Sequence, residues 1–352
     1  MPGDAVLDTF ELVEKEILAL HEPGDPAHLA GAAAEALRVH RDRLQRLDPA
    51  RLLVWALDAP LPPQPWANPF GDPALTVVHN EHFRIDLLYW NHNSTPTHKH
   101  VSCGAFAALH GPRLHQVFDF TERREIAPFV STGRMTLRER HLMAQGDVHE
   151  IHPDLVHDLF WLTRPSVTIS VRCNDHPGEV EQPWEFWEPG LTFLGMHQQP
   201  NADVRRRTAA MTTLRRAGER AFGSALTDLV RDGDPSLVYH VVMDTLASGP
   251  PRRWLPTILE ALAARADGFG SVLGDAIPHL LRKIRLYPVY TGDVNAQLVV
   301  SLLWGGASTE DIAAFVADNV PGADVDAVFA DAARRIADTG AEAPELDGWA
   351  GR

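Results

Sequence analysis

Two short stretches decide the fold: Thr97-His98-Lys99-His100, and GDVHEIHPDLVH from Gly146 to His157. In the first stretch two histidines stand two positions apart, so a strand would direct both imidazoles to one face. The second stretch has the form of a strand, a turn that begins at Pro153, and a returning strand that begins with His157. If these strands are neighbours in a small barrel, three histidines share one face and can hold one metal ion.

Outward from these stretches, the residues from Leu75 to Cys173 indicate strands. Between Phe83 and Tyr89, apolar residues alternate with Arg84 and Asp86, as a strand buried on one face requires. Turn signals such as His110–Pro112 separate further short candidates, and this spacing favours a sandwich or barrel. The further candidates are Gly104–Leu109, His115–Phe120, Met135–Leu142, Asp147–His152, Leu159–Leu162 and Val167–Cys173.

The flanks of this segment indicate helices. Apolar residues recur at helical spacing from Phe10 to Leu18, and a Pro-rich stretch then excludes regular structure between 60 and 73. Beyond 200 the pattern is helical again, and Ser308 with Asp311 forms a capping-box signal. We therefore predict an α+β protein with these parts: a helical segment with a Pro-rich arm (1–70), a β-barrel metal domain (71–178), an aromatic connector (179–200), a helical domain (201–340) and a tail (341–352).

Charge and composition exclude several classes of function. The 352 residues include 32 Lys and Arg against 47 Asp and Glu, which gives a formal net charge of −15. Such a balance disfavours nucleic-acid and membrane binding over most of the surface. The first residues are acidic and lack the apolar core of a signal peptide, and the only two cysteines, Cys103 and Cys173, fit a reducing compartment. We expect a cytoplasmic protein.

The residues 97–100 and 146–157 resemble the two motifs of the cupin fold. The carboxylate that usually follows the first motif is missing, since Gly104 and Ala105 stand there. In this respect the chain resembles the thiol dioxygenases of the cysteine and mercaptopropionate dioxygenase type, and the likeness runs from about 83 to 174. It includes the strand FRIDLLYW, which leads into the histidine pair, and GAFAALHGPRLHQVFDF after it. This resemblance implies a small β-barrel in which His98, His100 and His157 bind Fe(II).

Other candidate site residues follow from the resemblance, with clear departures. The outer Ser-x-His-x-Tyr of the family falls on Ser170, Arg172 and Asn174, so only the serine is kept. Arg172 is a candidate clamp for an anionic substrate, and Tyr89 a candidate to orient it. The cupin register favours His157 as the third ligand, because the turn at Pro153 must precede the ligand. His149 and His152 are the alternatives.

The C-terminal helices are expected to serve packing, dimerisation or partner binding. The stretch from Leu302 to Gly340 resembles the helical half of PqqD-like peptide-recognition domains, whose strands would have to come from Ile284–Asp293. A homodimer contact or a peptide partner is therefore expected for this half of the chain.

The sequence leads to one preferred hypothesis of function and to alternatives. Three imidazoles without a carboxylate leave positions open on the ion for an anionic substrate and O2. The preferred hypothesis is a mononuclear non-haem iron oxygenase, with a small or peptidyl anion, such as a thiol, as its substrate. The alternatives are a lyase, isomerase or hydrolase that uses Zn, Ni or Mn, and a ligand-binding cupin without catalysis.

Overall fold

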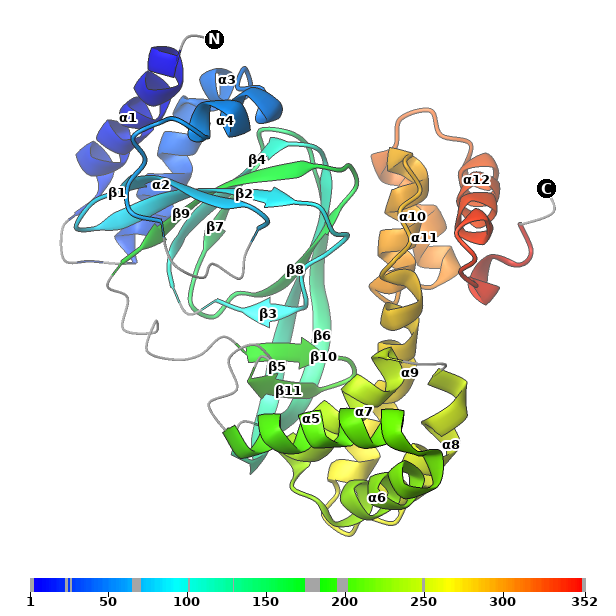
Figure 1. Cartoon of the computed structure of the whole chain (residues 1–352). Coiled ribbons are helices and arrows are strands. Elements are labelled where there is room, and N and C mark those ends of the chain that lie inside the picture. The colour runs from blue at the N-terminus through cyan, green and yellow to red at the C-terminus, as the bar shows by residue number, and fades with distance from the viewer. Residues whose placement is uncertain are drawn as a thin grey trace.

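A computed structural model describes residues 3–22, 25, 27–64, 71–100, 102–128, 130–174, 184–194, 202–248 and 251–349. Parts of all five predicted segments lie outside these residues; the longer ones are 65–70 of the Pro-rich arm, 175–178 of the barrel domain, 179–183 and 195–200 of the connector, and 350–352 of the tail. The described residues form an α+β structure in which strands are flanked by helices on both sides (Figure 1). No helix in the described part of the chain is long and apolar enough to cross a membrane.

The strands form two layers. A five-stranded sheet has the order β1-β2-β9-β4-β7, and a closed barrel has the order β10-β11-β6-β5-β8-β3. All pairs of neighbouring strands are antiparallel. The strands are β1 Ala74–His79, β2 Phe83–Trp90, β3 His98–Lys99, β4 Gly104–His110, β5 Arg113–Ala127, β6 Val130–Met143, β7 Val148–Ile151, β8 Val156–Trp161, β9 Ser166–Cys173, β10 Trp184–Trp187 and β11 Leu191–Leu194.

The two layers face one another across an inter-sheet space. One apolar cluster joins Leu88, Trp90 and Phe106 of the five-stranded sheet to Leu159 and Trp161 of β8. The odd-numbered apolar residues of β2 point the other way, where they pack against the N-terminal helices. These helices are α1 Gly3–Leu20, α2 His28–Val39, α3 Arg41–Leu44 and α4 Pro49–Ala56. The period of two along β2 thus separates a helix-covered face from a face toward the inter-sheet space.

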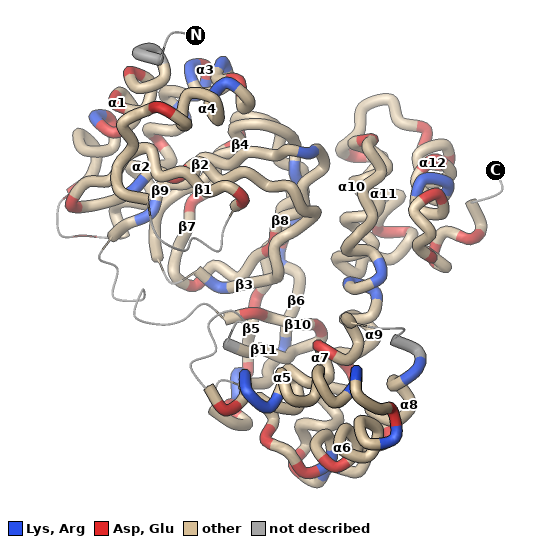
Figure 2. Tube along the Cα trace, in the orientation of Figure 1, with Lys and Arg blue, Asp and Glu red and all other residues tan. Residues whose placement is uncertain are grey.

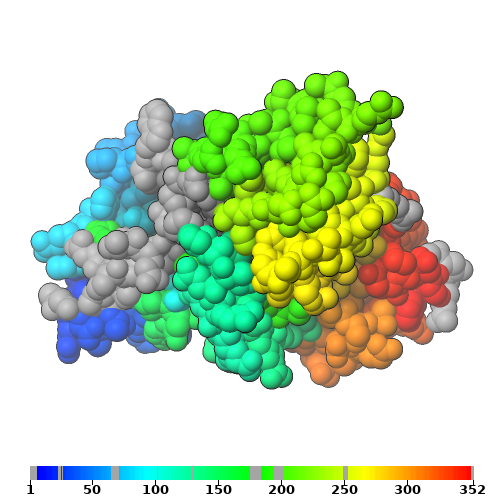
Figure 3. All heavy atoms as spheres, turned by 90° about the horizontal axis from the view of Figure 1, so that it is seen from below, coloured from blue at the N-terminus to red at the C-terminus, as the bar shows by residue number. Residues whose placement is uncertain are grey.

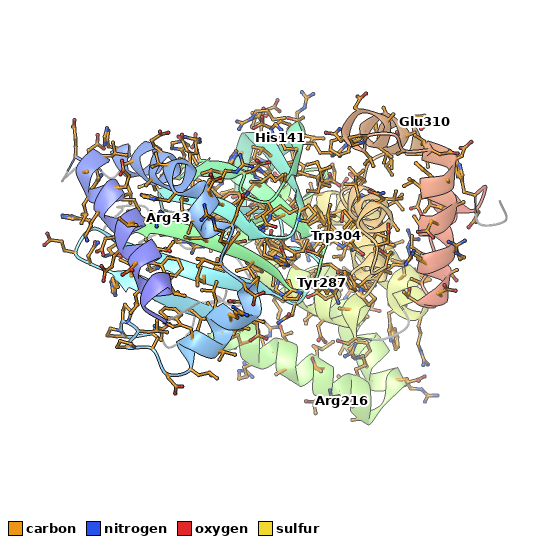
Figure 4. The ribbon with its side chains drawn as sticks, turned by 90° about the horizontal axis from the view of Figure 1, so that it is seen from above. Arg43, His141, Arg216, Tyr287, Trp304 and Glu310 are labelled. Atoms are coloured by element: carbon orange, nitrogen blue, oxygen red, sulfur yellow. The ribbon has the colours of Figure 1, made fainter. Side chains whose placement is uncertain are left out.

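The C-terminal half is helical and packs against the far side of the barrel. Its helices are α5 Ala202–Ala217, α6 Glu219–Asp232, α7 Pro235–Ala247, α8 Pro251–Ala263, α9 Phe269–Leu286, α10 Val294–Trp304, α11 Thr309–Asn319 and α12 Val325–Asp338, followed by a short 3₁₀ helix, Pro344–Leu346. Figure 3 shows α5–α9 beside the β5 and β6 hairpin, with the last helices on the side away from the N-terminus. Trp304, at the end of α10, lies in the middle of the molecule and packs edge-on against Phe160 of β8 (Figure 4).

The α+β class and the small antiparallel β-barrel with flanking helices confirm the prediction, and two local differences stand out. Strands β1, β10 and β11 were not among the strand candidates, and β10 and β11 extend the barrel sheet to Leu194, beyond the predicted range of 71–178. The capping box at Ser308 and Asp311 is present. The strands required between Ile284 and Asp293 are absent from these described residues, because α9 continues to Leu286 and a turn leads into α10.

Candidate metal centre

Three histidines meet on the inter-sheet face where β3 pairs with β8. His98 lies opposite His157 in the antiparallel register, and His100 follows two residues after His98. One ring nitrogen from each histidine lies within 4.8 Å of the other two. Nε2 of His100 and Nε2 of His157 are 2.7 Å apart. All three side chains are buried, and His157 is only 1% exposed. The structure therefore brings together the three residues that the sequence singled out as metal ligands.

Hydrogen bonds on the remote nitrogens favour the tautomer that a metal requires. Nδ1 of His98 lies 2.9 Å from the Pro96 carbonyl oxygen, which can only accept, so Nδ1 carries the proton. Nδ1 of His157 lies 2.8 Å from Nε2 of His115. In His98 this donation leaves Nε2 bare, and in His157 the tautomer that donates from Nδ1 to His115 is the one that leaves Nε2 bare, as metal ligation requires. The donor set thus fits a metal ion held by three Nε2 atoms.

Burial also keeps these imidazoles neutral. Loss of hydration lowers the pKa of His98 to about 4, and the charge of Arg172 acts in the same direction. Burial, followed by the neighbouring histidines, lowers the pKa of His157 well below its ordinary value. A metal ion therefore does not have to displace protons from these two rings at neutral pH.

The cluster contains no carboxylate. Among the described residues, His98, His100 and His157 form the only group of three or more potential ligands within reach of one ion. His152 is half-exposed and pairs with Glu150 at 3.3 Å, away from the cluster. His149 faces the inter-sheet space, but its ring contacts Phe106 and His115. The structure thus assembles His157, and neither alternative, with the histidine pair.

His115 of β5 is a site residue that the sequence analysis did not single out. Its side chain is fully buried, and its Nε2 contacts His157. Phe106 packs against both His115 and His157, with ring centroids 5.6 Å and 5.9 Å away. His115 therefore contacts the ring of His157 at its Nδ1, the nitrogen remote from His100. Only the register of β5 against β8 could have shown this, because the two residues are 42 positions apart.

We expect His115→Phe to weaken metal binding by about 10- to 100-fold, the usual effect of losing a partner of a ligating histidine. Phenylalanine fills a similar volume but cannot accept the hydrogen bond from His157. Isothermal titration with a divalent metal measures the change. The matched control is His141→Gln, since His141 is half-exposed and pairs with Glu139 instead. Equal affinities for the wild type and His115→Phe would contradict the role of His115.

Arg172 and Ser170 lie on β9 with their side chains toward the inter-sheet space. Ser170 stands opposite Asp86 of β2 and Phe106 of β4 in the two strand registers. Nε of Arg172 donates to Oγ of Ser170 at 3.3 Å. Burial is the main cause of the lowered pKa of His98 and of His100. The positive charge of Arg172 lowers both pKa values further. The structure thus brings Arg172 and Ser170 to the same side of β9 as the histidines.

Tyr89 does not reach this site. It lies on the opposite face of β2, in the core beneath the N-terminal helices. Its hydroxyl donates to the Pro49 carbonyl oxygen at 2.8 Å, at the start of α4. The prediction that Tyr89 orients substrate is therefore corrected: the period of two along β2 directs its side chain away from the inter-sheet space.

We expect Tyr89→Phe to reduce stability by about 1 kcal/mol, the usual net contribution of one hydrogen bond. Metal binding should be unchanged, because Tyr89 touches no residue of the centre. Denaturant unfolding and metal titration measure the two quantities. Loss of metal affinity at unchanged stability would contradict this placement.

Asn174 and Cys103 also lie outside the centre. Asn174 donates to the Asn80 carbonyl oxygen at 2.6 Å. Cys103 belongs to the core under the N-terminal helices, where its Sγ lies 3.2 Å from Sγ of Cys173. No cysteine sulfur is therefore placed among the three histidines.

A cleft of about 600 Å³ opens near the centre on the side of α2 and α3. Its lining includes His115, His141 and His149, with Arg38 and Arg41 at its rim. Both arginines are compensated, because Arg38 faces Glu150 and Arg41 faces Asp147. Figure 2 likewise shows both signs of charge interspersed over the helices. The cleft reaches His115, whose ring contacts the ligand His157.

Comparisons with known proteins give weak structural likenesses. No protein-family model and no curated protein matches the sequence. A structure of the DMSP lyases RdDddP and RnDddQII is similar at 14% identity and a TM-score of 0.30, over 51% of this chain and 97% of that chain. The hydroquinone 1,2-dioxygenase PnpCD, with Cd²⁺ and 4-hydroxybenzonitrile, is similar at 12% and 0.23, over 29% and 63%. Oxalate oxidase with glycolate is similar at 13% and 0.22, over 37% and 56%. The chain spans less than two thirds of the last two proteins.

Proposed function

We propose that this protein is a mononuclear non-haem iron oxygenase of the three-histidine cupin type. The observation that carries the proposal is the buried cluster of three neutral imidazoles without a carboxylate. Three neutral ligands leave the full charge of a divalent ion uncompensated, so an anionic substrate atom binds favourably beside them. Iron bound there would supply open coordination positions for that atom and for O2.

The residues of the chain suit the handling of a small anion. Arg172 projects from β9 toward the same space as the histidines, and Ser170 accepts a hydrogen bond from it. A guanidinium in a buried site binds carboxylates strongly and with defined geometry. Phe106 lines the same space with an apolar ring. Arg172 would therefore orient an anionic substrate, while Phe106 and its neighbours exclude water.

The substrate class that we propose is a small or peptidyl anion, with thiols as the first candidates. The thiol proposal rests on the resemblance of 83–174 to the thiol dioxygenases. A peptidyl substrate or peptide partner rests on the likeness of 302–340 to the helical half of the PqqD-like domains, whose two helices correspond to α11 and α12. A dimer contact through the same helices is the other proposal for this region.

The test is metal analysis of protein purified without oxygen, combined with O2 uptake. We expect near-stoichiometric iron, and O2 consumption that depends on one member of a panel of thiols, amino acids and short peptides. Iron-loaded protein that consumes no O2 with any member would count against the oxygenase.

A second candidate is a lyase, isomerase or hydrolase that uses a redox-silent metal. The specific observation is again the ligand set, because three histidines with an open position also form catalytic zinc sites. Tightly bound Zn, Ni or Mn without O2 uptake would support this candidate. Retained metal without turnover would instead support a binding protein.

A further inference from the structure

Directly behind the ligand pair, two polar side chains join the same two strands on the opposite face. Thr97 precedes His98 and Asp158 follows His157, so their side chains point away from the inter-sheet space. The hydroxyl of Thr97 donates to the carboxylate of Asp158 at 2.7 Å. Both side chains are buried, at 2% and 1% exposed. One hydrogen bond therefore joins the two residues adjacent to the ligands His98 and His157.

The ladder between β3 and β8 is short. Strand β3 consists of His98 and Lys99, which pair with His157 and Val156 of β8. The residues before β3 add an isolated bridge between Ser94 and Phe160, and the Thr95 amide donates to the Leu159 carbonyl oxygen at 2.9 Å. A second threonine on this segment reinforces the junction, because the Leu159 amide donates to the Thr95 hydroxyl at 3.0 Å. Side-chain hydrogen bonds therefore add to the backbone pairing of the two strands that present the ligands.

The C-terminal helices cover this junction and keep it dry. Lys283 of α9 is buried, with its ammonium 5.0 Å from the Trp187 ring centroid and 4.5 Å from that of Trp304. Burial raises the pKa of Asp158 to about 7, and the positive charge of Lys283 opposes that shift. The Gln116 amide is oriented so that its oxygen accepts from Arg140. Its nitrogen then donates to the Asp158 carboxylate at 3.3 Å. Water is thus excluded from competing with the Thr97 hydroxyl for Asp158.

We propose that the hydrogen bond between Thr97 and Asp158 positions His98 and His157 for metal binding. The inference rests on the metal site of the proposed function, and not on the reaction at that site. Metal affinity depends on holding the ligand nitrogens in a fixed geometry, and outer contacts supply that restraint. Thr97 and Asp158 are positioning residues, and the helical half contributes to the centre by shielding them.

A second explanation is that the charge of Asp158 attracts the cation directly. The two explanations make opposite predictions for two variants. Thr97→Val removes the hydrogen bond and keeps the charge. Asp158→Asn removes the charge but keeps an oxygen that accepts from Thr97. If the hydrogen bond positions the ligands, Thr97→Val lowers the metal affinity more than Asp158→Asn does. If the charge attracts the cation, Asp158→Asn lowers the metal affinity more.

The experiment is titration of the full-length protein with Co²⁺, followed by the visible absorption of the bound ion. We expect Thr97→Val to weaken binding by about tenfold or more, with altered absorption bands. Thr97→Ser, which restores the hydroxyl, should return to within about threefold of the wild type, as should Asp158→Asn. The matched control is Thr76→Val, because the Thr76 hydroxyl donates to the buried Asp86 at 2.7 Å but adjoins no ligand.

Each outcome decides between the claims. Wild-type affinity in Thr97→Val, an equal loss in Thr76→Val, or a larger loss in Asp158→Asn than in Thr97→Val would overturn the positioning role. If Thr97→Val does not fold, Thr97→Ser and Asp158→Asn decide, and a loss of more than about tenfold in either overturns it. A wild type that binds no Co²⁺, Fe²⁺ or Zn²⁺ would overturn the metal site itself, and the inference with it.

Discussion

Replacing His157 with alanine is expected to abolish stoichiometric metal binding and any metal-dependent activity. His157 is the ligand that joins the two strand segments, and its Nε2 lies 2.7 Å from that of His100. Two histidines would remain, both on the segment that contains β3. We expect the metal affinity to fall by more than about 100-fold, which exceeds the effect expected for loss of His115, the hydrogen-bond partner of this ligand. Metal analysis after gel filtration in a weak chelator measures the loss, and His100→Ala should behave alike.

The control for this variant is His152→Ala. His152 comes from the same motif and is half-exposed, and its ring pairs with Glu150. We expect this variant to keep metal and stability close to those of the wild type. Because His157→Ala also leaves His115 without its partner, circular dichroism must show that the protein remains folded. Stoichiometric metal in folded His157→Ala would exclude the three-histidine centre.

Arg172→Met is expected to lower kcat/KM for an anionic substrate by about 30- to 1000-fold while metal content stays stoichiometric. The reason is that a buried charged contact with a partner is worth about 2–4 kcal/mol. Methionine keeps much of the apolar stem and removes the guanidinium. Steady-state O2 uptake with the substrate found by the panel measures the effect.

Lys99→Met is the matched control for Arg172. Lys99 stands between the two ligands of the first motif, but it pairs with Val156 on the face turned away from the histidines. We expect the kcat/KM of Lys99→Met to stay within about threefold of the wild type, because a half-buried cation on the other face of the strand contributes little to the buried site. If both variants lose activity equally, or if an uncharged analogue of the substrate is affected equally by Arg172→Met, then Arg172 does not bind the anion.

Local sequence patterns were sufficient to predict much of this structure. The alternation along β2 indicated a strand, because burial of one face of a strand leaves a period of two. Turn signals between short segments indicated the others, among them β4 and β9. The pair of histidines two residues apart and the turn at Pro153 predicted the three residues that the structure assembles. These features depend on neighbours in the chain, which a single sequence contains.

The rest depends on contacts between distant segments. Strand β3 has only two residues, too few to leave a periodic pattern. His115 and Asp158 become parts of the centre through the register of β5 and β3 against β8. The wrong prediction for Tyr89 also arose because contacts between distant segments are not visible in the sequence. The alternation placed Tyr89 on one face of β2, but it did not show which face is turned toward the histidines. Lys283 reaches the barrel from a helix more than 100 residues later in the chain.

The measurement that tests the central claim most directly is X-ray absorption spectroscopy of the protein loaded with one Fe²⁺ per chain. Scattering from the imidazole rings gives the number of histidine ligands, independently of any substrate. We predict three imidazoles, with the remaining ligands light atoms from solvent, and the loss of this signal in His157→Ala. Fewer than three imidazoles, or a spectrum that His157→Ala leaves unchanged, would contradict the claim that His98, His100 and His157 form the metal centre.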